Sequence, residues 1–503
     1  MTTSARAESV RRSRFDIAVA NTGAGVGGEV ADLGLRTMGS LLMARLLGPA
    51  GLGAWLVARA VGFDLGGIAA RCGLDEAAVR FVARSRGRED PRGARGVLRA
   101  GLRWSALTAG LATVGLLVVA PVLGSAVFKK PEVTGLIQIL APSLLLFAPV
   151  MVLLGALQGI DRVALRVAAQ KVALPGVQMA VLAIALACGW GMRGVIAAHY
   201  AGVAALAVVA VSVGLRAWRA SVGRGPGTYD RRELGLFAGP LALSELSTFV
   251  ILWIDILMLG ALSTQTEAGI YGAGQRVAGL VALPLNAVNM MFAPMIASLH
   301  GRGEREGLAE MFRLTTRWVL FASLPLFVLI VYAGKDILGL FGAGFSAGYG
   351  ALVLLAVGKL VSSATGSVGY VLNMTGHQRL NLLNTVVLGT VNAGLNVLWI
   401  SRYGAKGAAA AAALSLGLVN ILRVVEVRSI LGLRLISRGY IVVLAGAVAG
   451  IVCVWALRGV VSGSAGSVAM GVLFLLVYGG IAAIWGLDDT DREAAKAALR
   501  RIR

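Results

Sequence analysis

Residues 271–294, YGAGQRVAGLVALPLNAVNMMFAP, decide the fold class of this chain. The run is long enough to cross a hydrocarbon core about 30 Å thick as a helix, and nearly all of its residues are apolar or small. Its one permanent charge, Arg276, lies a few residues inside the run. A cation facing lipid at this depth costs about 2.5–3.5 kcal/mol on insertion scales, so its position requires an explanation.

The composition of the whole chain agrees with this segment. Of the 503 residues, 57% are hydrophobic and only 14% are charged, and the mean hydropathy is +0.80. A water-soluble protein of this length needs far more polar surface. The 68 glycines allow close packing between membrane helices. The sequence therefore predicts an all-α polytopic membrane protein.

Apolar runs of spanning length recur along the chain and predict about fourteen transmembrane helices. Short polar or Gly- and Pro-containing connections separate them. The predicted spans are 18–44, 51–70, 104–128, 136–158, 168–190, 194–215, 236–260, 269–297, 316–334, 349–371, 381–401, 407–425, 440–460 and 466–486.

The basic residues predict the orientation of these spans. Most of the 47 Lys and Arg residues fall in alternate connections and in both tails, which indicates that both termini are cytoplasmic. The net charge of +22 is then mainly an orientation signal, and no nucleic-acid partner is expected. The Arg-rich loop 71–103 and the tail segment 491–503 are expected to be interfacial helices or solvated charge.

The chain is also predicted to contain an internal duplication. Gly48 aligns with Gly260, and the segment 53–55 (GAW) aligns with 269–271 (GIY). Arg59 then aligns one position from Arg276. Two related halves that rock around a site near the membrane midplane are the basis of alternating access.

Several of these segments resemble a known family. ARLLGPAGLGAW, then GLDEAAVRFVAR, and in the second half DILMLG with AGIYGAGQRVAGLVALPLNAVNMMFAPMIASL are similar to polysaccharide flippases. These Wzx-like oligosaccharide transporters belong to the multidrug/oligosaccharidyl-lipid/polysaccharide (MOP) exporter superfamily and are related to the lipid II flippase. The resemblance covers about residues 15–435 and implies two six-helix lobes around a central cavity, with two added C-terminal helices.

The expected domains follow from that architecture. They are a cytoplasmic tail (1–17), an N-lobe (18–215), a cytoplasmic linker (216–235), a C-lobe (236–430), the last two helices (440–486) and a cytoplasmic tail (487–503).

The resemblance also implies a purpose for Arg276. The lipid II flippase has a functional cavity arginine in an ADRL…P stretch of its eighth helix, and AGQRVAGLVALP carries Arg276 and Pro284 in the matching places. Arg59 is a looser match to a second cavity arginine. The first span departs from that flippase, because it places Glu29 and Asp32 beside Arg36.

Charges inside predicted spans must face water or one another, because lipid exposure is costly. An arginine fork suits a pyrophosphate, so Arg276, Arg59 and Arg36 are the predicted pyrophosphate-binding residues. Asp32 and Arg36 are spaced i, i+4, and Arg59 lies near Asp64, so structural ion pairs are the alternative reading of both. The candidates for cavity-lining or ion-coupling roles are Glu29, Asp32, Asp64, Glu245, Asn286 and Lys359, and the hinge candidates are Pro240 and Pro284.

The function implied is movement of undecaprenyl-pyrophosphate-linked oligosaccharide between leaflets of the cytoplasmic membrane. The expected driving force is the membrane potential or a coupled H⁺ or Na⁺; no other cofactor, no metal and no catalytic residue is expected. Membrane lipids and polysaccharide polymerase or assembly proteins are expected partners. A multidrug and toxin extrusion antiporter is the first alternative, and a non-transporting subunit of a polysaccharide assembly complex is the second. An enzyme is disfavoured because no connection is long enough for a catalytic domain and no Walker motif is present.

Overall fold

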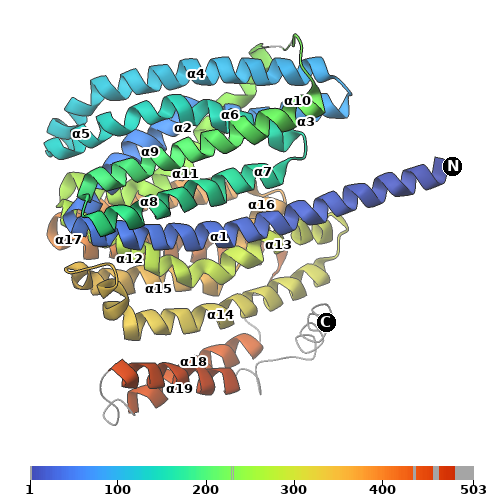
Figure 1. Cartoon of the computed structure of the whole chain (residues 1–503). Helices are drawn as coiled ribbons and strands as arrows, with labels where there is room; N and C mark the ends of the chain where they lie inside the picture. Colours follow the sequence, from blue (N-terminus) through green and yellow to red (C-terminus); the bar gives the residue numbers. More distant parts are fainter. Residues whose placement is uncertain (1–2, 228, 230, 434–437, 457–463, 482–503) are drawn as a thin grey trace. The chain divides into compact units, whose positions relative to one another are not determined.

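The computed structural model describes residues 3–227, 229, 231–433, 438–456 and 464–481, and within these ranges every regular element is a helix (Figure 1). The chain divides into two units, Met1–Gly269 and Ile270–Arg503, and each is described by itself below. The predicted all-α fold class is therefore confirmed. The predicted lobe and tail boundaries stay predictions, and the C-terminal tail 487–503 lies outside the described residues.

Ten helices in the described part of the chain are long and apolar enough to cross a membrane, so the chain is a multi-pass membrane protein. Two of the long helices contain a glycine with non-helical backbone angles, Gly48 in α1 (Thr3–Arg59) and Gly404 in α17 (Gln378–Leu431). Glycine adopts these angles because it has no Cβ to clash with the backbone. Each break falls between two predicted spans. The count of fourteen spans stays a prediction.

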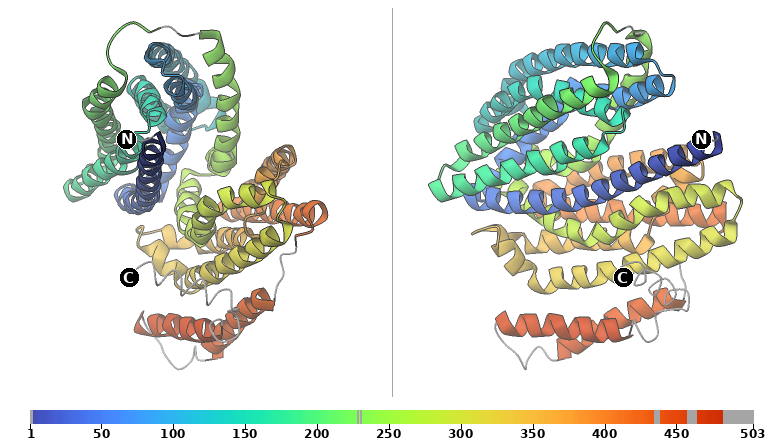
Figure 2. Two further views of the ribbon diagram at one scale, coloured as in Figure 1. Left: turned by 90° about the vertical axis from the view of Figure 1, so that its right-hand side faces the viewer. Right: turned by 45° about the vertical axis from the view of Figure 1, so that its right-hand side comes forward.

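The first unit is a bundle of α-helices interrupted by short π-helical and 3₁₀ segments (Figure 2). After α1 these elements are η1 (Ala60–Leu65), α2 (Gly66–Arg71), α3 (Leu74–Gly87), α4 (Pro91–Val122), η2 (Leu123–Val127), α5 (Pro131–Leu140), η3 (Ala141–Ser143), α6 (Leu144–Gly159), α7 (Val163–Val167), η4 (Ala168–Ala173), α8 (Leu174–Cys188), α9 (Gly191–Val209), η5 (Ala210–Gly214), α10 (Leu215–Val222) and α11 (Arg231–Leu262). The helix α12 (Gln265–Ala278) begins in this unit.

The core of the first unit forms where α3 packs against α4, α6 and α11. α3 lies in the loop that was expected to be interfacial or solvated, yet it buries Ala77, Phe81 and Val82. α3 approaches α6 closely at Gly155, because glycine has no Cβ. A Cβ at this position would lie only 2.2 Å from the carbonyl oxygen of Asp75. The Arg-rich loop is therefore part of the packed unit.

Two glycines that the duplication aligned make a reciprocal contact. A Cβ at Gly53 would lie 1.7 Å from the carbonyl oxygen of Gln265, and a Cβ at Gly269 would lie 1.9 Å from the carbonyl oxygen of Pro49. Each glycine thus meets the residue four positions before the other glycine. This is the pattern of a local two-fold contact between equivalent segments.

The second unit continues with η6 (Gly279–Ala282), α13 (Leu283–Gly301), α14 (Arg305–Gly339), η7 (Phe345–Gly348), α15 (Tyr349–Thr365), α16 (Val368–Met374), α17, α18 (Arg438–Ala456) and α19 (Ser464–Ile481). α18 and α19 pack against each other and against α14. The hydroxyl of Tyr478 donates to the carbonyl oxygen of Phe321 at 3.0 Å, and that of Tyr440 donates to the carbonyl oxygen of Ala364 at 3.1 Å. The ends of the predicted spans 440–460 and 466–486 lie outside the described residues.

Candidate functional site

The charged residues of the first predicted span form a four-membered cluster with a lysine from another helix. Arg36 Nε lies 2.5 Å from Asp32 Oδ1. Lys171 Nζ lies 3.1 Å from Glu29 Oε1 and 3.6 Å from Asp32 Oδ2. The cluster contains two acids and two bases, so its formal charges balance.

A π-helical segment carries the lysine of this cluster. Lys171 lies within η4, where one turn contains an extra residue compared with an α-helix. α1 packs closely here, since a Cβ at Gly28 would lie 2.2 Å from Val167 Cγ1. The close packing of α1 places Glu29 and Asp32 within reach of Lys171.

A second ion pair joins Arg59 and Asp64. Arg59 Nε lies 3.4 Å from Asp64 Oδ2, and both side chains are about three-quarters buried. Residues five apart point about 140° away from each other on an α-helix. They lie on one face here because the intervening residues form the π-helical segment η1. His199 lies nearby as a packing residue, with its Nε2 3.0 Å from Ser143 Oγ and its ring 4.5 Å from that of Phe63.

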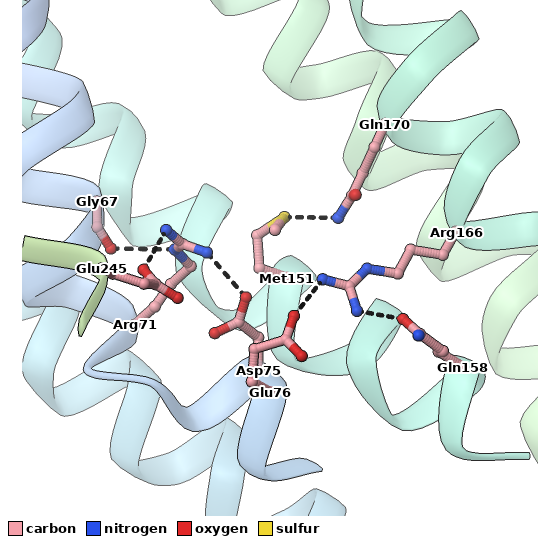
Figure 3. A network of polar contacts seen from close by, with 9 residues as sticks. All are labelled: Gly67, Arg71, Asp75, Glu76, Met151, Gln158, Arg166, Gln170 and Glu245. Carbon is pink, nitrogen blue, oxygen red and sulfur yellow. Dashed lines mark hydrogen bonds and ion pairs between the residues drawn. The ribbon is translucent and has the colours of Figure 1, made fainter. Parts of the chain in front are cut away.

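The most buried ion cluster surrounds Arg71, at the end of α2 (Figure 3). Its guanidinium donates to Asp75 Oδ2 at 2.8 Å and to Glu245 Oε2 at 2.9 Å, and Nε donates to the carbonyl oxygen of Gly67 at 3.2 Å. The Asp75 side chain is 1% exposed. Arg71 therefore connects α2, α3 and α11 through its fixed planar fork.

A neighbouring arginine extends the network toward α7 (Figure 3). Arg166 Nη2 lies 2.9 Å from Glu76 Oε1, and Arg166 also donates to Gln158. Asp75 Oδ1, on the other side, is buried and has no hydrogen-bond partner among the described residues. Four residues of this network were not predicted as site residues, because they lie at span ends, where the two arginines count toward the orientation signal: Arg71, Asp75, Glu76 and Arg166. The i, i+4 spacing of Arg71 and Asp75 was the available signal.

The second unit holds the remaining predicted residues. Arg276 is exposed near the end of α12, Asn286 is exposed on α13, and Lys359 is half-buried on α15. The 3₁₀ turn η6 separates α12 from α13, so Arg276 and Asn286 are not related by uniform α-helical spacing. Pro284 is the second residue of α13, which follows this turn, whereas Pro240 lies inside the continuous helix α11.

The chemistry available in the first unit is reversible charge pairing. Glu29, Asp32, Asp64 and Glu245 each lie within 3.6 Å of a basic side chain. An anionic ligand would compete with these carboxylates for the arginines, and a proton or cation would compete with the arginines for the carboxylates. Within the described residues, no group of three or more His, Cys, Asp or Glu side chains is arranged to hold a metal ion.

Known sequences match both halves of the chain. The family described as polysaccharide biosynthesis protein matches residues 18–300, and the MatE family matches residues 240–398. Two relatives come from Haloferax volcanii. The probable low-salt glycan biosynthesis flippase Agl15 is 25% identical over 198 residues, 39% of this chain and 42% of that protein. The probable flippase AglR is 31% identical over 188 residues, 36% of this chain and 39% of that protein. The matches thus span about two fifths of these relatives' length.

Solved membrane transporters share the fold. The lipid II flippase MurJ in its inward closed conformation superposes with a TM-score of 0.72 at 12% identity, covering 93% of this chain and 98% of that one. An inward-facing multidrug resistance MATE family transporter of the MOP superfamily gives a TM-score of 0.67 at 16% identity, covering 80% and 94%. At these identities the likeness concerns the fold. With more than half of its length matched by one family, the chain belongs to the polysaccharide biosynthesis protein family and has the fold of the MOP superfamily.

Proposed function

We propose that this protein is a flippase for undecaprenyl-pyrophosphate-linked oligosaccharide. It moves the lipid-linked repeat unit from the inner to the outer leaflet of the cytoplasmic membrane by alternating access. Membership of the polysaccharide biosynthesis protein family is the observation that carries this proposal. The protein works as a transporter rather than as an enzyme, beside the polymerase and assembly proteins that use the flipped unit.

The embedded arginines support an anionic substrate. Arg36 and Arg59 keep 38% and 25% of their side-chain surface exposed, so neither side chain is fully enclosed by its ion pair. A pyrophosphate offers several oxygens to a guanidinium fork, which gives charge-assisted bidentate hydrogen bonds. Arg276, exposed on α12, is the third arginine in this role.

The driving force is the membrane potential or a coupled ion. A potential that is negative inside favours outward movement of an anion by about 2.3 kcal/mol per charge for each 100 mV. Alternatively, H⁺ or Na⁺ binds a carboxylate that its basic partner has released. Glu29, Asp32, Asp64 and Glu245 are the carboxylates in this position, and Asn286 and Lys359 are polar candidates in the second unit.

The match of the MatE family to residues 240–398 favours one second candidate, a multidrug and toxin extrusion antiporter. Such a protein needs carboxylates that accept organic cations. In the first unit the four candidate carboxylates are already within 3.6 Å of Lys or Arg, which favours an anionic cargo instead.

Native mass spectrometry of gently solubilised protein tests the proposal. Wild type should retain a polyprenyl-pyrophosphate glycan, and Arg276→Ala should lose it. Arg276→Lys should retain part of it, because the charge stays while the bidentate fork is lost. Arg305→Ala is the matched control, since Arg305 is exposed at the first residue of α14 in the same unit.

Two results would contradict the flippase. Organic cations that bind wild type and are lost in Glu29→Gln would establish the antiporter. A glycan lipid retained equally by wild type and by all three arginine variants would place its binding elsewhere and support a subunit without transport activity.

A further inference from the structure

A cavity of about 500 Å³ lies at the beginning of α4, beside the linker that joins α10 to α11. None of the residues predicted for substrate binding or ion coupling contributes to it. In Figure 1 this linker passes over the end of α4 that lies near α10. The residues lining the cavity are Gly96, Arg99, Ala100, Arg103, Trp104, Leu107, Gly227 and Tyr229.

Specific contacts fix the linker wall of this cavity. Arg95 Nη1 donates to the carbonyl oxygen of Val222 at 2.8 Å, and Arg95 Nε donates to that of Pro226 at 3.1 Å. A Cβ at Gly227 would lie 2.3 Å from the amide nitrogen of Gly96, so the two backbones touch. The ring of Tyr229 packs 5.5 Å from that of Phe81. The cavity is therefore a built feature of the unit.

Two arginines give the cavity its charge. Arg99 and Arg103 lie one turn apart on α4, both are exposed, and among the described residues no acidic side chain lines the cavity with them. Guanidinium groups spaced in this way suit a phosphate, which accepts charge-assisted hydrogen bonds from more than one fork. The predicted orientation places this end of α4 at the cytoplasmic face, where anionic lipids attract basic residues.

An apolar face of α4 continues from the cavity into the membrane. Trp104 and Leu107 line the cavity and are 44% and 54% exposed. The spacing that follows is three or four residues, which keeps one face of the helix. Its further exposed members are Leu111, Val114, Val118 and Val122.

We propose that this cavity binds the phosphate headgroup of an anionic glycerophospholipid from the cytoplasmic leaflet. Arg99 and Arg103 bind the phosphate, Trp104 lies at the glycerol level as an interfacial aromatic residue, and the acyl chains follow the apolar face of α4. A volume of about 500 Å³ is within the usual range for small-ligand pockets. This inference does not depend on the transported substrate.

The test uses the full-length protein, delipidated in detergent and titrated with phosphatidylglycerol or phosphatidylcholine under native mass spectrometry. The variant Arg99→Gln/Arg103→Gln should bind phosphatidylglycerol about 30-fold more weakly than wild type. Each arginine near an anionic lipid surface raises the affinity about fivefold, and the variant removes two of them. Binding of phosphatidylcholine, which has no net charge, should change little. The control Arg88→Gln/Arg92→Gln removes two exposed charges, one from the preceding connection and one from the first turn of α4, and should bind like wild type.

Three outcomes would overturn the proposal. Equal weakening in both double variants would indicate a general charge effect. Displacement of the lipid by inorganic phosphate at the same concentration would indicate a site for free phosphate. Binding of a polyprenyl diphosphate that is weakened in Arg99→Gln/Arg103→Gln, with no measurable affinity for phosphatidylglycerol, would assign the cavity to the transported lipid. Melting temperatures of both variants should match wild type, which separates lost binding from lost folding.

Discussion

At the scale of single residues, the first unit places its membrane charges in neutralising pairs. Arg71 is the most connected of them, since it links Asp75 and Glu245 from two other helices. The desolvation of such buried ions is costly, and removing one partner leaves the others uncompensated. The same arrangement makes each pair exchangeable, because a proton or an anionic ligand can replace one of its members.

The variant Arg71→Gln tests this view of the network. It leaves Asp75 and Glu245 without their cation, so we expect a loss of about 3–5 kcal/mol in unfolding free energy. Thermal or denaturant unfolding in detergent measures the loss. The control is Arg86→Gln, which removes an exposed ion pair with Asp161 and should cost about 0–1 kcal/mol. Equal losses in the two variants would mean that the Arg71 network contributes no more than a surface pair.

At the scale of elements, close helix packing and fixed helix ends shape the unit. Gly53 and Gly269 allow two helix segments to touch through their backbones. Lys130, between η2 and α5, donates to the carbonyl oxygens of Gly260 and Ser263 at 3.1 and 3.0 Å. These carbonyls lie at the end of α11, where a cation also interacts favourably with the helix dipole.

Gly53→Ala should destabilise the protein strongly, because the added methyl group collides with the backbone of Gln265 and not with a movable side chain. We expect a loss of at least about 2 kcal/mol, as for other overpacked sites. Gly110→Ala is the control, since nothing lies within 4 Å of a Cβ there. It should be neutral or gain up to about 1 kcal/mol from helix propensity. If Gly53→Ala unfolds at the same temperature as Gly110→Ala, the close contact is absent in the native protein.

Lys130 predicts a pH dependence of stability. Burial lowers the pKa of Lys130 below its ordinary value of 10.5. The folded chain therefore releases this proton at a lower pH than the unfolded chain, so stability rises with pH between the two pKa values. The measurement is the unfolding free energy of wild type and of Lys130→Met at several alkaline pH values. The difference between the two proteins at each pH isolates the contribution of Lys130. A difference that falls with rising pH would contradict the assignment.

At the scale of the whole molecule, the span count and the orientation are linked. A chain with about fourteen spans and a cytoplasmic N-terminus has a cytoplasmic C-terminus, and each missed or extra helix inverts every later connection. The described residues contain ten helices of spanning length, two of them with a break at a glycine. Orientation is therefore measurable loop by loop.

Cysteine labelling in intact cells tests this topology. In a background where Cys72, Cys188 and Cys453 are replaced by Ser, Arg193→Cys and Lys335→Cys should react with an impermeant maleimide. Arg88→Cys and Arg302→Cys should react only after permeabilisation. All four positions are exposed, so burial of the introduced cysteine does not prevent labelling. Labelling of Lys335→Cys from the inside alone would show that the count is wrong between residues 193 and 335.

The sequence was enough to predict the all-helical membrane class. It also offered the ion pairs Asp32–Arg36 and Arg59–Asp64 as an alternative reading, and both pairs form in the structure. Arg59 meets Asp64 because a π-helical segment lies between them, and periodicity arguments assume 3.6 residues per turn. Glu245 meets Arg71 across 174 residues, and such a contact depends on tertiary packing alone. The 3₁₀ turn η6 similarly interrupts the regular α-helical spacing between Arg276 and Asn286.

The reciprocal contact of Gly53 and Gly269 has a meaning for the ancestry of the chain. Identical segments that touch in this way are what a homodimer of half-length chains forms about its symmetry axis. Fusion of two such genes keeps the contact within one polypeptide and releases each copy from having to match the other. If the predicted duplication is correct, Gly53 and Gly269 mark the former dimer contact, and the acidic residues of α1 and the arginine of α12 mark positions at which the two copies differ.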